Sequence, residues 1–472
     1  MTLRRAQEPT RAFAAVDLGA TSGRVMIGRV GEGTLDLEPV SRFPNGPVER
    51  ADGLHWNFGA LYEHVLDGLA EAVRREPAIE SIGIDSWAVD YGLLREGELL
   101  AEPFHYRDER TTQGVEDVHA ITPFAELYRR NGLQFLPFNT LYQYRADARV
   151  AEADAALLIP DLIAFLLTGH QVAERTNAST TGLLRVADGE WDADLASALD
   201  IPTAILPALV DPGATIGALR PEIAERIGKD LPVVAVGSHD TASAVVAAPL
   251  ASPNAAYISC GTWGLVGLEL AEPVVSDAAR AANFTNELGV DGRIRFLHNV
   301  TGLWLLSETV REWEAADGAP IDLQSLLQQA AAVADDVPLF NANDPSLSAP
   351  GDMPTRIAAL LGESAPTPRA AFARSIVESI AAAFAVAVQD ASALSGQPVD
   401  SIHLVGGGSL NRLLCQATAD RSGLPVLAGP VEATALGNVL VQARTAGAAP
   451  ASLEELRNLV AHTHEPVRYD PR

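Results

Sequence analysis

The segment FAAVDLGATSGRVMIG, Phe13–Gly28, decides the fold prediction. An apolar run ends at Asp17, a polar turn passes from Gly19 to Gly23, and a second apolar run follows. This pattern predicts a strand, a tight turn and a second strand. Glycines permit positive φ and close approach, so backbone N–H groups and nearby hydroxyls of the turn can point at an anion, and Asp17 is placed to hold a metal ion accompanying it. A plain hairpin with a hydrated turn explains the same pattern.

A second glycine turn, Gly406–Gly408, follows the mostly apolar run Ile402–Val405. Two turns of phosphate size in the two halves of one chain predict a nucleotide held in a cleft between domains. The length of 472 residues exceeds that at which a single hydrophobic core keeps growing. We therefore expect an α/β protein with an amino-terminal domain of residues 1–249 and a carboxy-terminal domain of residues 250–472, linked through residues 249–256.

Composition excludes several classes of partner. Lys and Arg number 34 against 61 Asp and Glu, the net charge is −27, and the chain has no basic run. Nucleic acid and anionic membrane surfaces are therefore not expected partners. Cys260 and Cys415 lack metal or redox spacing, and we find no signal-peptide pattern and no stretch approaching eighteen apolar residues. These features predict a cytoplasmic protein, which we expect to be a monomer or a homodimer.

A candidate sugar site follows the next buried strand. A third strand, Thr34–Phe43, and a helix starting at Asn57 separate the first hairpin from the apolar run Ile79–Ile84, which ends in DSWAVDY, Asp85–Tyr91. Ligands bind at the carboxyl ends of such strands. Two carboxylates with two aromatic rings suit a polyol, because carboxylates accept hydrogen bonds from hydroxyls while ring faces cover C–H groups. A solvated turn is the alternative interpretation.

A candidate general base follows the apolar strand Pro232–Val236. The motif GSHDT, Gly237–Thr241, comes next and leads into a run of small residues. With Ser238 as N-cap, Asp240 would lie in the first turn of a helix, where the helix dipole favours its ionised form. Asp240 is thus either a base for proton transfer or merely a helix-capping residue. His239 is expected to act as a hydrogen-bonding neighbour of the site.

The second half repeats the pattern of the first hairpin. Apolar runs at Ala256–Ser259 and Gly264–Leu270 flank a small turn at Gly261-Thr262, which indicates an internal duplication. The apolar stripe of Arg369–Leu394 has helical period and predicts a core helix packed against a sheet.

Two further segments complete the prediction. Prolines and Gly217 interrupt every run between residues 204 and 230, so this segment is expected to be loop-rich. Residues Glu432–Gln442 form one more helix candidate, expected beside the same cleft as the glycine turn Gly406–Gly408.

Taken together, these motifs resemble the FGGY carbohydrate kinases over nearly the whole chain. The resemblance implies a two-domain sugar-kinase or actin-like ATPase fold (ribonuclease H-like), each domain a mixed sheet flanked by helices, with a cleft between. It also implies ATP-dependent transfer of a phosphoryl group to a sugar hydroxyl. The motifs that carry it are AAVDLGATSGRVM, SIGIDSWAVDYGLL, YRDERT, QFLPFNTLYQ, GSHDTASAV, GTWGL, NVTGLWLL, HLVGGGSLNRLL and AGPVEATALGN.

The resemblance assigns expected roles to individual residues. Asp17 would orient hydrated Mg²⁺, Thr262 would meet the γ-phosphate of ATP, and Asp240 would be the catalytic base. The ATP phosphates would lie against the turn of Ala20, Thr21, Ser22, Gly23 and Arg24, and the adenosine against Gly407 and Asn411. The sugar would contact Asp85, Ala88, His239, Asp240, Thr241 and Asn299.

The sugar-side segments favour L-rhamnulose, phosphorylated at its C1 hydroxyl in L-rhamnose catabolism. Kinases of the family acting on xylulose, fuculose, ribulose or glycerol remain alternatives, as does a sugar-binding regulator that has lost catalysis; a chaperone-like ATPase would lack a polyol pocket and the carboxylate of GSHDT. The sequence departs from the family at two positions: Ala88 stands where Gly is usual and Ser307 where Gln is found in close relatives.

Overall fold

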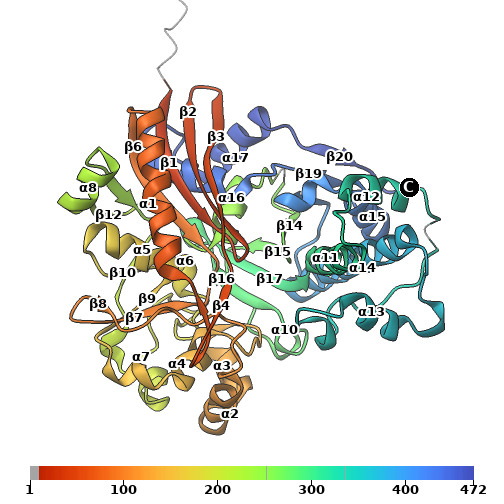
Figure 1. Ribbon diagram of the computed structural model, residues 1–472, viewed down its shortest axis with the longest axis horizontal. Coiled ribbons are helices and arrows are strands. Elements are labelled where there is room, and N and C mark those ends of the chain that lie inside the picture. Colours follow the sequence, from red (N-terminus) through yellow and green to blue (C-terminus); the bar gives the residue numbers. More distant parts are fainter. Residues whose placement is uncertain (1–9, 251, 335) are drawn as a thin grey trace, which may run out of the picture. The chain divides into compact units, whose positions relative to one another are not determined.

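The computed structural model describes residues 10–250, 252–334 and 336–472 (Figure 1). Their contacts define two compact units, which are described separately. Unit 1 comprises the chain up to Ala247 together with Leu270–Arg295 and Ala433–Thr463, and unit 2 comprises Ala248–Glu269, Phe296–Glu432 and His464–Arg472. Both units are therefore discontinuous in sequence, and the contiguous division at residue 249 stays a prediction. Residue 251, within the predicted link, lies outside the described residues.

Unit 1 is built on a mixed sheet with the strand order β12-β13-β6-β1-β2-β3. The first hairpin pairs β1 with β2 antiparallel, while β1, β6 and β13 run parallel. The carboxyl ends of β1, β6 and β13 therefore lie at one edge of the sheet. The strand bounds are β1 Arg11–Leu18, β2 Ser22–Gly31, β3 Thr34–Pro44, β6 Ile79–Ser86, β12 Thr215–Ala218 and β13 Pro232–Val234.

Helices α1 (Phe58–Arg75) and α16 (Ala433–Thr445) pack on this sheet. Helix α1 begins after Asn57, as predicted, and its Gly68 lies against Val25. Helix α16 covers nearly all of the predicted helix Glu432–Gln442 and belongs to unit 1. Small residues allow this packing, because a Cβ at Gly437 would lie 1.8 Å from the carbonyl oxygen of Ser243 on helix α9 (Asp240–Ala247).

The segment 204–230, predicted to be loop-rich, contains regular structure. Strands β11 (Ala208–Val210) and β12 and helix α8 (Pro221–Ile227) lie within it. Pro221 starts α8 instead of interrupting it, because the first helical position needs no N–H donor.

Figure 1 also shows remaining elements of unit 1. The strands are β4 Pro47–Arg50, β5 Gly53–Trp56, β7 Tyr91–Arg95, β8 Glu98–Leu99, β9 Ala155–Leu158, β10 Val172–Glu174 and β16 Thr285–Leu288. The helices are α2 Thr111–Ile121, α3 Phe124–Asn131, α4 Thr140–Ala146, α5 Ile159–Thr168, α6 Arg175–Ala178, α7 Ala193–Ala198, α10 Asp277–Ala281 and α17 Leu453–Thr463.

Unit 2 repeats the arrangement of a hairpin beside a parallel strand. Strand β14 pairs antiparallel with β15 and parallel with β18, as β1 does with β2 and β6. The structure therefore confirms the repeated pattern that the sequence indicated. The strands are β14 Ala255–Cys260, β15 Trp263–Leu270, β17 Ile294–Thr301, β18 Ser401–Val405, β19 Val426–Ala428 and β20 Val467–Tyr469. The helices are α11 Trp304–Asp317, α12 Leu323–Ala331, α13 Met353–Leu361, α14 Arg369–Ser395 and α15 Arg412–Ser422.

Helix α14 is the predicted core helix of unit 2. In the described part of the chain it is the one helix long and apolar enough to cross a membrane by length and composition, although the sequence analysis found no such stretch. The alanines that stand between its larger apolar residues raise the mean hydropathy of the helix. The most apolar window of the helix is 78% buried within the protein, which is the behaviour of a core helix.

Candidate active site

The carboxyl ends of three parallel strands bring together three predicted site residues of unit 1. The N–H of Trp87 donates to the carbonyl of Leu18 at 3.2 Å, and the N–H of Ser86 donates to the carbonyl of Ser238 at 2.9 Å. Ser86 also forms a parallel bridge with His239. Asp17, Asp85 and Asp240, at or beside these ends, therefore lie at one edge of the sheet.

The first turn differs in one respect from its prediction. Neither Gly19 nor Gly23 adopts positive φ. Gly23 lies in strand β2, where a Cβ would approach the Phe43 ring to 2.2 Å. The glycine is therefore required by packing beneath the turn rather than by its backbone angles. The side chain of Asn45 also stabilises this turn, because its Nδ2 donates a hydrogen bond of 2.8 Å to the carbonyl oxygen of Gly19.

Asp17 is nearly buried and paired with Arg24. The two residues face each other in the β1–β2 register, and Arg24 Nε donates to Asp17 Oδ2 at 2.9 Å. The guanidinium is about one third exposed. The hairpin thus places one carboxylate and one cation beside the turn of Ala20, Thr21 and Ser22.

Asp85 lies opposite Asp17 in the parallel β1–β6 register and is fully buried. Its Oδ2 accepts a hydrogen bond of 2.6 Å from Nδ2 of Asn438 on helix α16. Burial, with the neighbouring charges of Asp17 and Asp240, raises the pKa of Asp85 well above its ordinary value. A contact between Asp85 and the sugar stays a prediction.

Asp90 does not form the expected polyol-binding pair with Asp85. It is fully buried, and its carboxylate accepts hydrogen bonds from the indole N–H groups of Trp56 and Trp87 and from Nε2 of Gln143. Burial raises the pKa of Asp90 to about 6. The Asp90 carboxylate is therefore hydrogen-bonded within the protein interior, where the indoles of Trp56 and Trp87 are among its donors.

The chain between the two carboxylates is strained. Val89 has φ of 68°, a conformation that β-branched residues rarely adopt. Its carbonyl oxygen accepts a hydrogen bond of 2.8 Å from the hydroxyl of Thr140, which helps to hold the conformation. Such strain clusters at functional sites. The half-buried Ala88 precedes Val89 in this turn.

Asp240 begins helix α9 with a partly exposed carboxylate. Its Oδ1 accepts from the N–H of Thr241 at 2.6 Å and from the Thr241 hydroxyl at 3.2 Å, and it lies 3.4 Å from Nε2 of His239. Among the residues that the structure describes, no donor to Oδ2 is found. One oxygen of the carboxylate is therefore held by the protein, and the other remains available.

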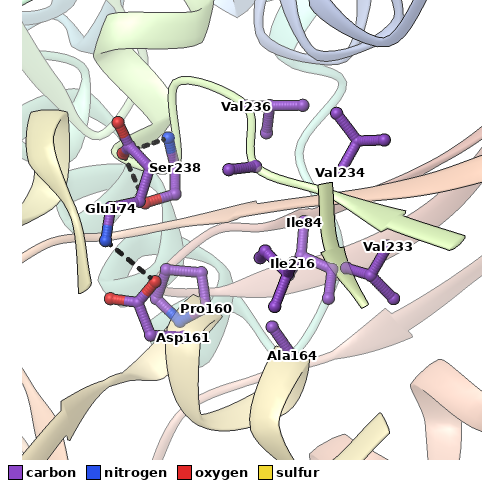
Figure 2. Close-up of a pocket in the computed structure, with 11 residues that line it drawn as sticks. Ile84, Pro160, Asp161, Ala164, Glu174, Ile216, Val233, Val234, Val236 and Ser238 are labelled. Carbon is purple, nitrogen blue, oxygen red and sulfur yellow. Dashed lines mark hydrogen bonds between the residues drawn. The ribbon is translucent and has the colours of Figure 1, made fainter. Parts of the chain in front are cut away.

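Ser238 does not cap helix α9 as predicted. Its N–H and hydroxyl both donate to Oε2 of Glu174, at 2.9 and 2.7 Å. Figure 2 shows these bonds beside Asp161, whose Oδ1 accepts from the N–H of Glu174 at 3.2 Å. The side chain of Glu174 thus anchors the loop that carries Asp240 and orients the Ser238 hydroxyl.

His239 is held by a buried ion pair. Its Nδ1 lies 3.0 Å from Nη2 of Arg295 and 3.3 Å from Oε2 of Glu287. Arg295 and Glu287 are themselves 3.1 Å apart, and both are buried. These three residues and Asp240 belong to unit 1.

In unit 2 the glycine turn Gly406–Gly408 packs against Cys260, the last residue of β14. The turn after β14 carries Thr262, whose carbonyl accepts from the N–H of Trp304 at the start of α11. Gly408 packs so closely on Cys260 that a Cβ there would lie 2.3 Å from the sulfur. Asn411 caps α15 through the N–H of Leu414 at 3.1 Å, so its side chain is used within the protein.

Three other predicted positions of unit 2 are located as follows. Gly407 follows Gly406, which has φ of 83° and requires glycine because a side chain is strained there. Asn299 lies in strand β17 and is half-buried. Ser307 lies exposed in the first turns of α11.

Sequence reasoning missed several residues that shape this site. Glu174, Glu287, Arg295 and Asn438 contact predicted site residues from distant parts of the chain, and no local pattern marks any of them. The positive φ of Val89 was also missed, because valine gives no signal for it.

Comparison with known families gives the class of the protein. Residues 13–247 match the model for the N-terminal domain of the FGGY family of carbohydrate kinases, and residues 256–446 match its C-terminal domain. The chain therefore belongs to the FGGY family of carbohydrate kinases, a class that uses ATP to phosphorylate sugars.

Curated relatives are similar along almost the entire chain. A protein of Bacteroides thetaiotaomicron named rhamnulokinase is 38% identical over 470 residues, which cover 98% of this chain and 96% of that protein. A rhamnulokinase of Klebsiella pneumoniae strain 342 is 42% identical over 462 residues, covering 95% of this chain and 91% of that protein.

Solved structures confirm the fold. Gluconate kinase from Lactobacillus acidophilus has a TM-score of 0.81 at 17% identity, with 98% of this chain and 94% of that chain covered. Plasmodium falciparum glycerol kinase with ADP has a TM-score of 0.78 at 14% identity over the same shares. The protein therefore has the predicted sugar-kinase fold, with mixed sheets flanked by helices.

Proposed function

We propose that this protein catalyses the ATP-dependent phosphorylation of L-rhamnulose at its C1 hydroxyl, yielding L-rhamnulose 1-phosphate and ADP. The observation that carries the proposal is the identity of about 40% with proteins named rhamnulokinase across nearly the full length of both chains. Its product would feed the catabolism of L-rhamnose in the cytoplasm. The more distant sugar-kinase structures share the fold without favouring another substrate.

In this proposal the hairpin turn of unit 1 binds the phosphates of ATP through backbone N–H groups and the hydroxyls of Thr21 and Ser22, with Arg24 adding a positive charge. Thr262 contributes to the γ-phosphate, and Gly407 and Asn411 border the adenosine. The side-chain oxygen of Asn411 caps α15, so the proposed contact with the adenosine is made by the other atoms of Asn411.

The donor set fits a hydrated magnesium ion. The described residues contain no cluster of three or more metal-ligating side chains. Mg²⁺ in kinases keeps several waters and takes only one or two carboxylates besides substrate phosphates, which the nearly buried Asp17 can supply. When bound, the ion would neutralise charge on the phosphates of ATP.

Asp240 would act as the general base. As the C1 oxygen of the ketose forms its bond to the γ-phosphorus, the C1 hydroxyl proton passes to Asp240 and the bond from phosphorus to the oxygen of ADP breaks. The geometry suits this role because Oδ1 is held by Thr241 and lies 3.4 Å from Nε2 of His239, while Oδ2 is free of protein donors in the described chain.

The remaining sugar contacts are proposed at Asp85, Ala88, His239, Thr241 and Asn299. A sugar with several hydroxyl groups requires hydrogen-bond donors and acceptors of the protein at fixed positions. The strained turn at Ala88-Val89 would supply backbone groups at one of these positions.

A coupled assay of ADP release across a ketose panel tests the proposal. With ATP and Mg²⁺, L-rhamnulose should give the highest kcat/KM among L-rhamnulose, L-fuculose, D-xylulose, L-ribulose and glycerol. A clearly higher kcat/KM for D-xylulose or glycerol would contradict the substrate assignment while leaving the kinase family intact. No turnover of any member would contradict catalysis itself.

A further inference from the structure

The buried ion pair behind His239 has no role in the function described so far. Arg295 in β17 is 0% exposed and Glu287 in β16 is 6% exposed. Their charged groups approach to 3.1 Å, and both reach Nδ1 of His239. His239 in turn lies next to the proposed base.

Stability alone explains this arrangement poorly. Within the described chain, Arg295 Nη1 has no hydrogen-bond partner and neither has Oε2 of Glu287 in hydrogen-bond geometry, although both atoms are buried. Burying an incompletely satisfied ion pair costs more free energy than packing apolar residues of the same volume. A function for the pair would account for the cost.

The contact with Arg295 decides which nitrogen of His239 carries the proton. A guanidinium can only donate hydrogen bonds, so Nδ1, 3.0 Å from Nη2, must accept. We assign the proton of the neutral ring to Nε2 on this basis. Nε2 faces Oδ1 of Asp240 at 3.4 Å. The N–H of the ring therefore lies beside the oxygen that Thr241 holds.

We infer that Arg295 and Glu287 are positioning residues for phosphoryl transfer: Arg295, oriented by Glu287, fixes the Nε2–H tautomer of His239, which holds Oδ1 of Asp240 and leaves Oδ2 to take the substrate proton. This inference rests on the proposed role of Asp240 as the base. It adds a relay of four side chains, Glu287, Arg295, His239 and Asp240, in which only Asp240 exchanges a proton with substrate.

The charged groups facing His239 in this relay come from three elements. Asp240 belongs to α9, Glu287 to β16 and Arg295 to β17. Removing Arg295 would leave Nδ1 beside the Glu287 carboxylate, which accepts hydrogen bonds. The ring would then carry its proton on Nδ1, and Nε2 would no longer donate to Asp240.

Kinetics of Arg295→Met in the full-length enzyme test the relay. We expect kcat with L-rhamnulose to fall roughly 10- to 100-fold, as misplacement of a reacting group does, with the KM for ATP within threefold of the parent. Arg295→Lys, which keeps a donor and the charge, should recover part of kcat. The matched control is Arg374→Met on α14, because the largely buried Arg374 also pairs with a buried glutamate, Glu378. That control should lose stability but keep kcat within threefold.

A spectroscopic measurement on the parent keeps the inference testable even if Arg295→Met fails to fold. The ¹⁵N shifts of the His239 ring, assigned by their loss in His239→Gln, should report the neutral Nε2–H tautomer near pH 7.5. An Nδ1–H tautomer or an imidazolium would overturn the inference, as would a folded Arg295→Met enzyme with kcat within threefold of the parent. A parent inactive on every sugar would instead contradict the proposed function, and the ring shifts would still test the geometry.

Discussion

Asn438 donates a hydrogen bond of 2.6 Å to the carboxyl group of Asp85, although 353 positions separate the two residues. Asn438 Oδ1 also accepts from Gln442 Nε2 at 2.7 Å, and Gln442 reaches the carbonyl of Ala14 at 3.0 Å. Helix α16, which lies late in the sequence, thus supplies hydrogen-bond donors to buried polar groups of strands β1 and β6. Unit 1 is incomplete without a segment near the carboxyl terminus.

Asn438→Ala should therefore destabilise the protein. Leaving the fully buried Asp85 without its donor is expected to lower the free energy of unfolding by about 1–3 kcal/mol. Urea unfolding at neutral pH measures the loss. The exposed Asn458 on α17 offers a control, and Asn458→Ala should change stability by less than about 0.5 kcal/mol. Equal effects of the two variants would show that the buried bond contributes nothing.

The pH dependence of stability should reveal the protonation state of Asp161. Burial and the neighbouring Glu174 raise the pKa of Asp161 well above 3.8. Between the unfolded and folded pKa values the unfolded chain is ionised while the folded chain keeps its proton, so the parent loses about 1.4 kcal/mol of stability per pH unit in that window.

Asp161→Asn removes this titration while preserving shape. The stability of the variant relative to the parent should therefore rise as the pH increases from 4.5 to 7.5, as judged by urea unfolding. Asp194→Asn, at an exposed position, is the control and should show no comparable trend. A constant difference between the Asp161→Asn variant and the parent over this range would mean that Asp161 ionises normally.

Ala88→Gly should change the choice of sugar. One methyl group in a packed pocket is worth roughly 1–3 kcal/mol of discrimination. The relative kcat/KM values among ketoses should shift, while the KM for ATP stays nearly constant. Ala187→Gly, in an exposed turn of unit 1, removes the same methyl group away from the proposed site. If the sugar preference of Ala88→Gly matched that of the control, Ala88 would not border the sugar.

The parts of the fold predicted from sequence are those with local signals. The hairpin β1–β2, the repeat at β14–β15 and the core helix α14 follow from apolar periodicity and from turn residues within each segment. Asp17 and Asp240 could be proposed because each ends or follows a strand. Local patterns therefore located the candidate site.

The parts that could not be predicted depend on contacts between distant segments. Arg295 reaches His239 across 56 positions, and Ser238 bonds to Glu174 across 64, which is why Ser238 was mistaken for a helix cap. Asp90 was mistaken for a sugar ligand because the ring of Trp56, which covers it, comes from another strand. Tertiary packing determines such contacts, and the hydrophobic periodicity of a single segment does not predict them.

The central claim, that Asp240 is the base, is tested most directly by kcat of Asp240→Asn with L-rhamnulose and saturating ATP. Asn is nearly isosteric and can still accept the Thr241 N–H at Oδ1, so the melting temperature and ATP affinity should stay close to those of the parent. Because the amide cannot take the C1 proton, kcat should fall roughly 10²- to 10⁴-fold. A folded, ATP-binding Asp240→Asn enzyme that turns over L-rhamnulose within a few-fold of the parent would contradict the account.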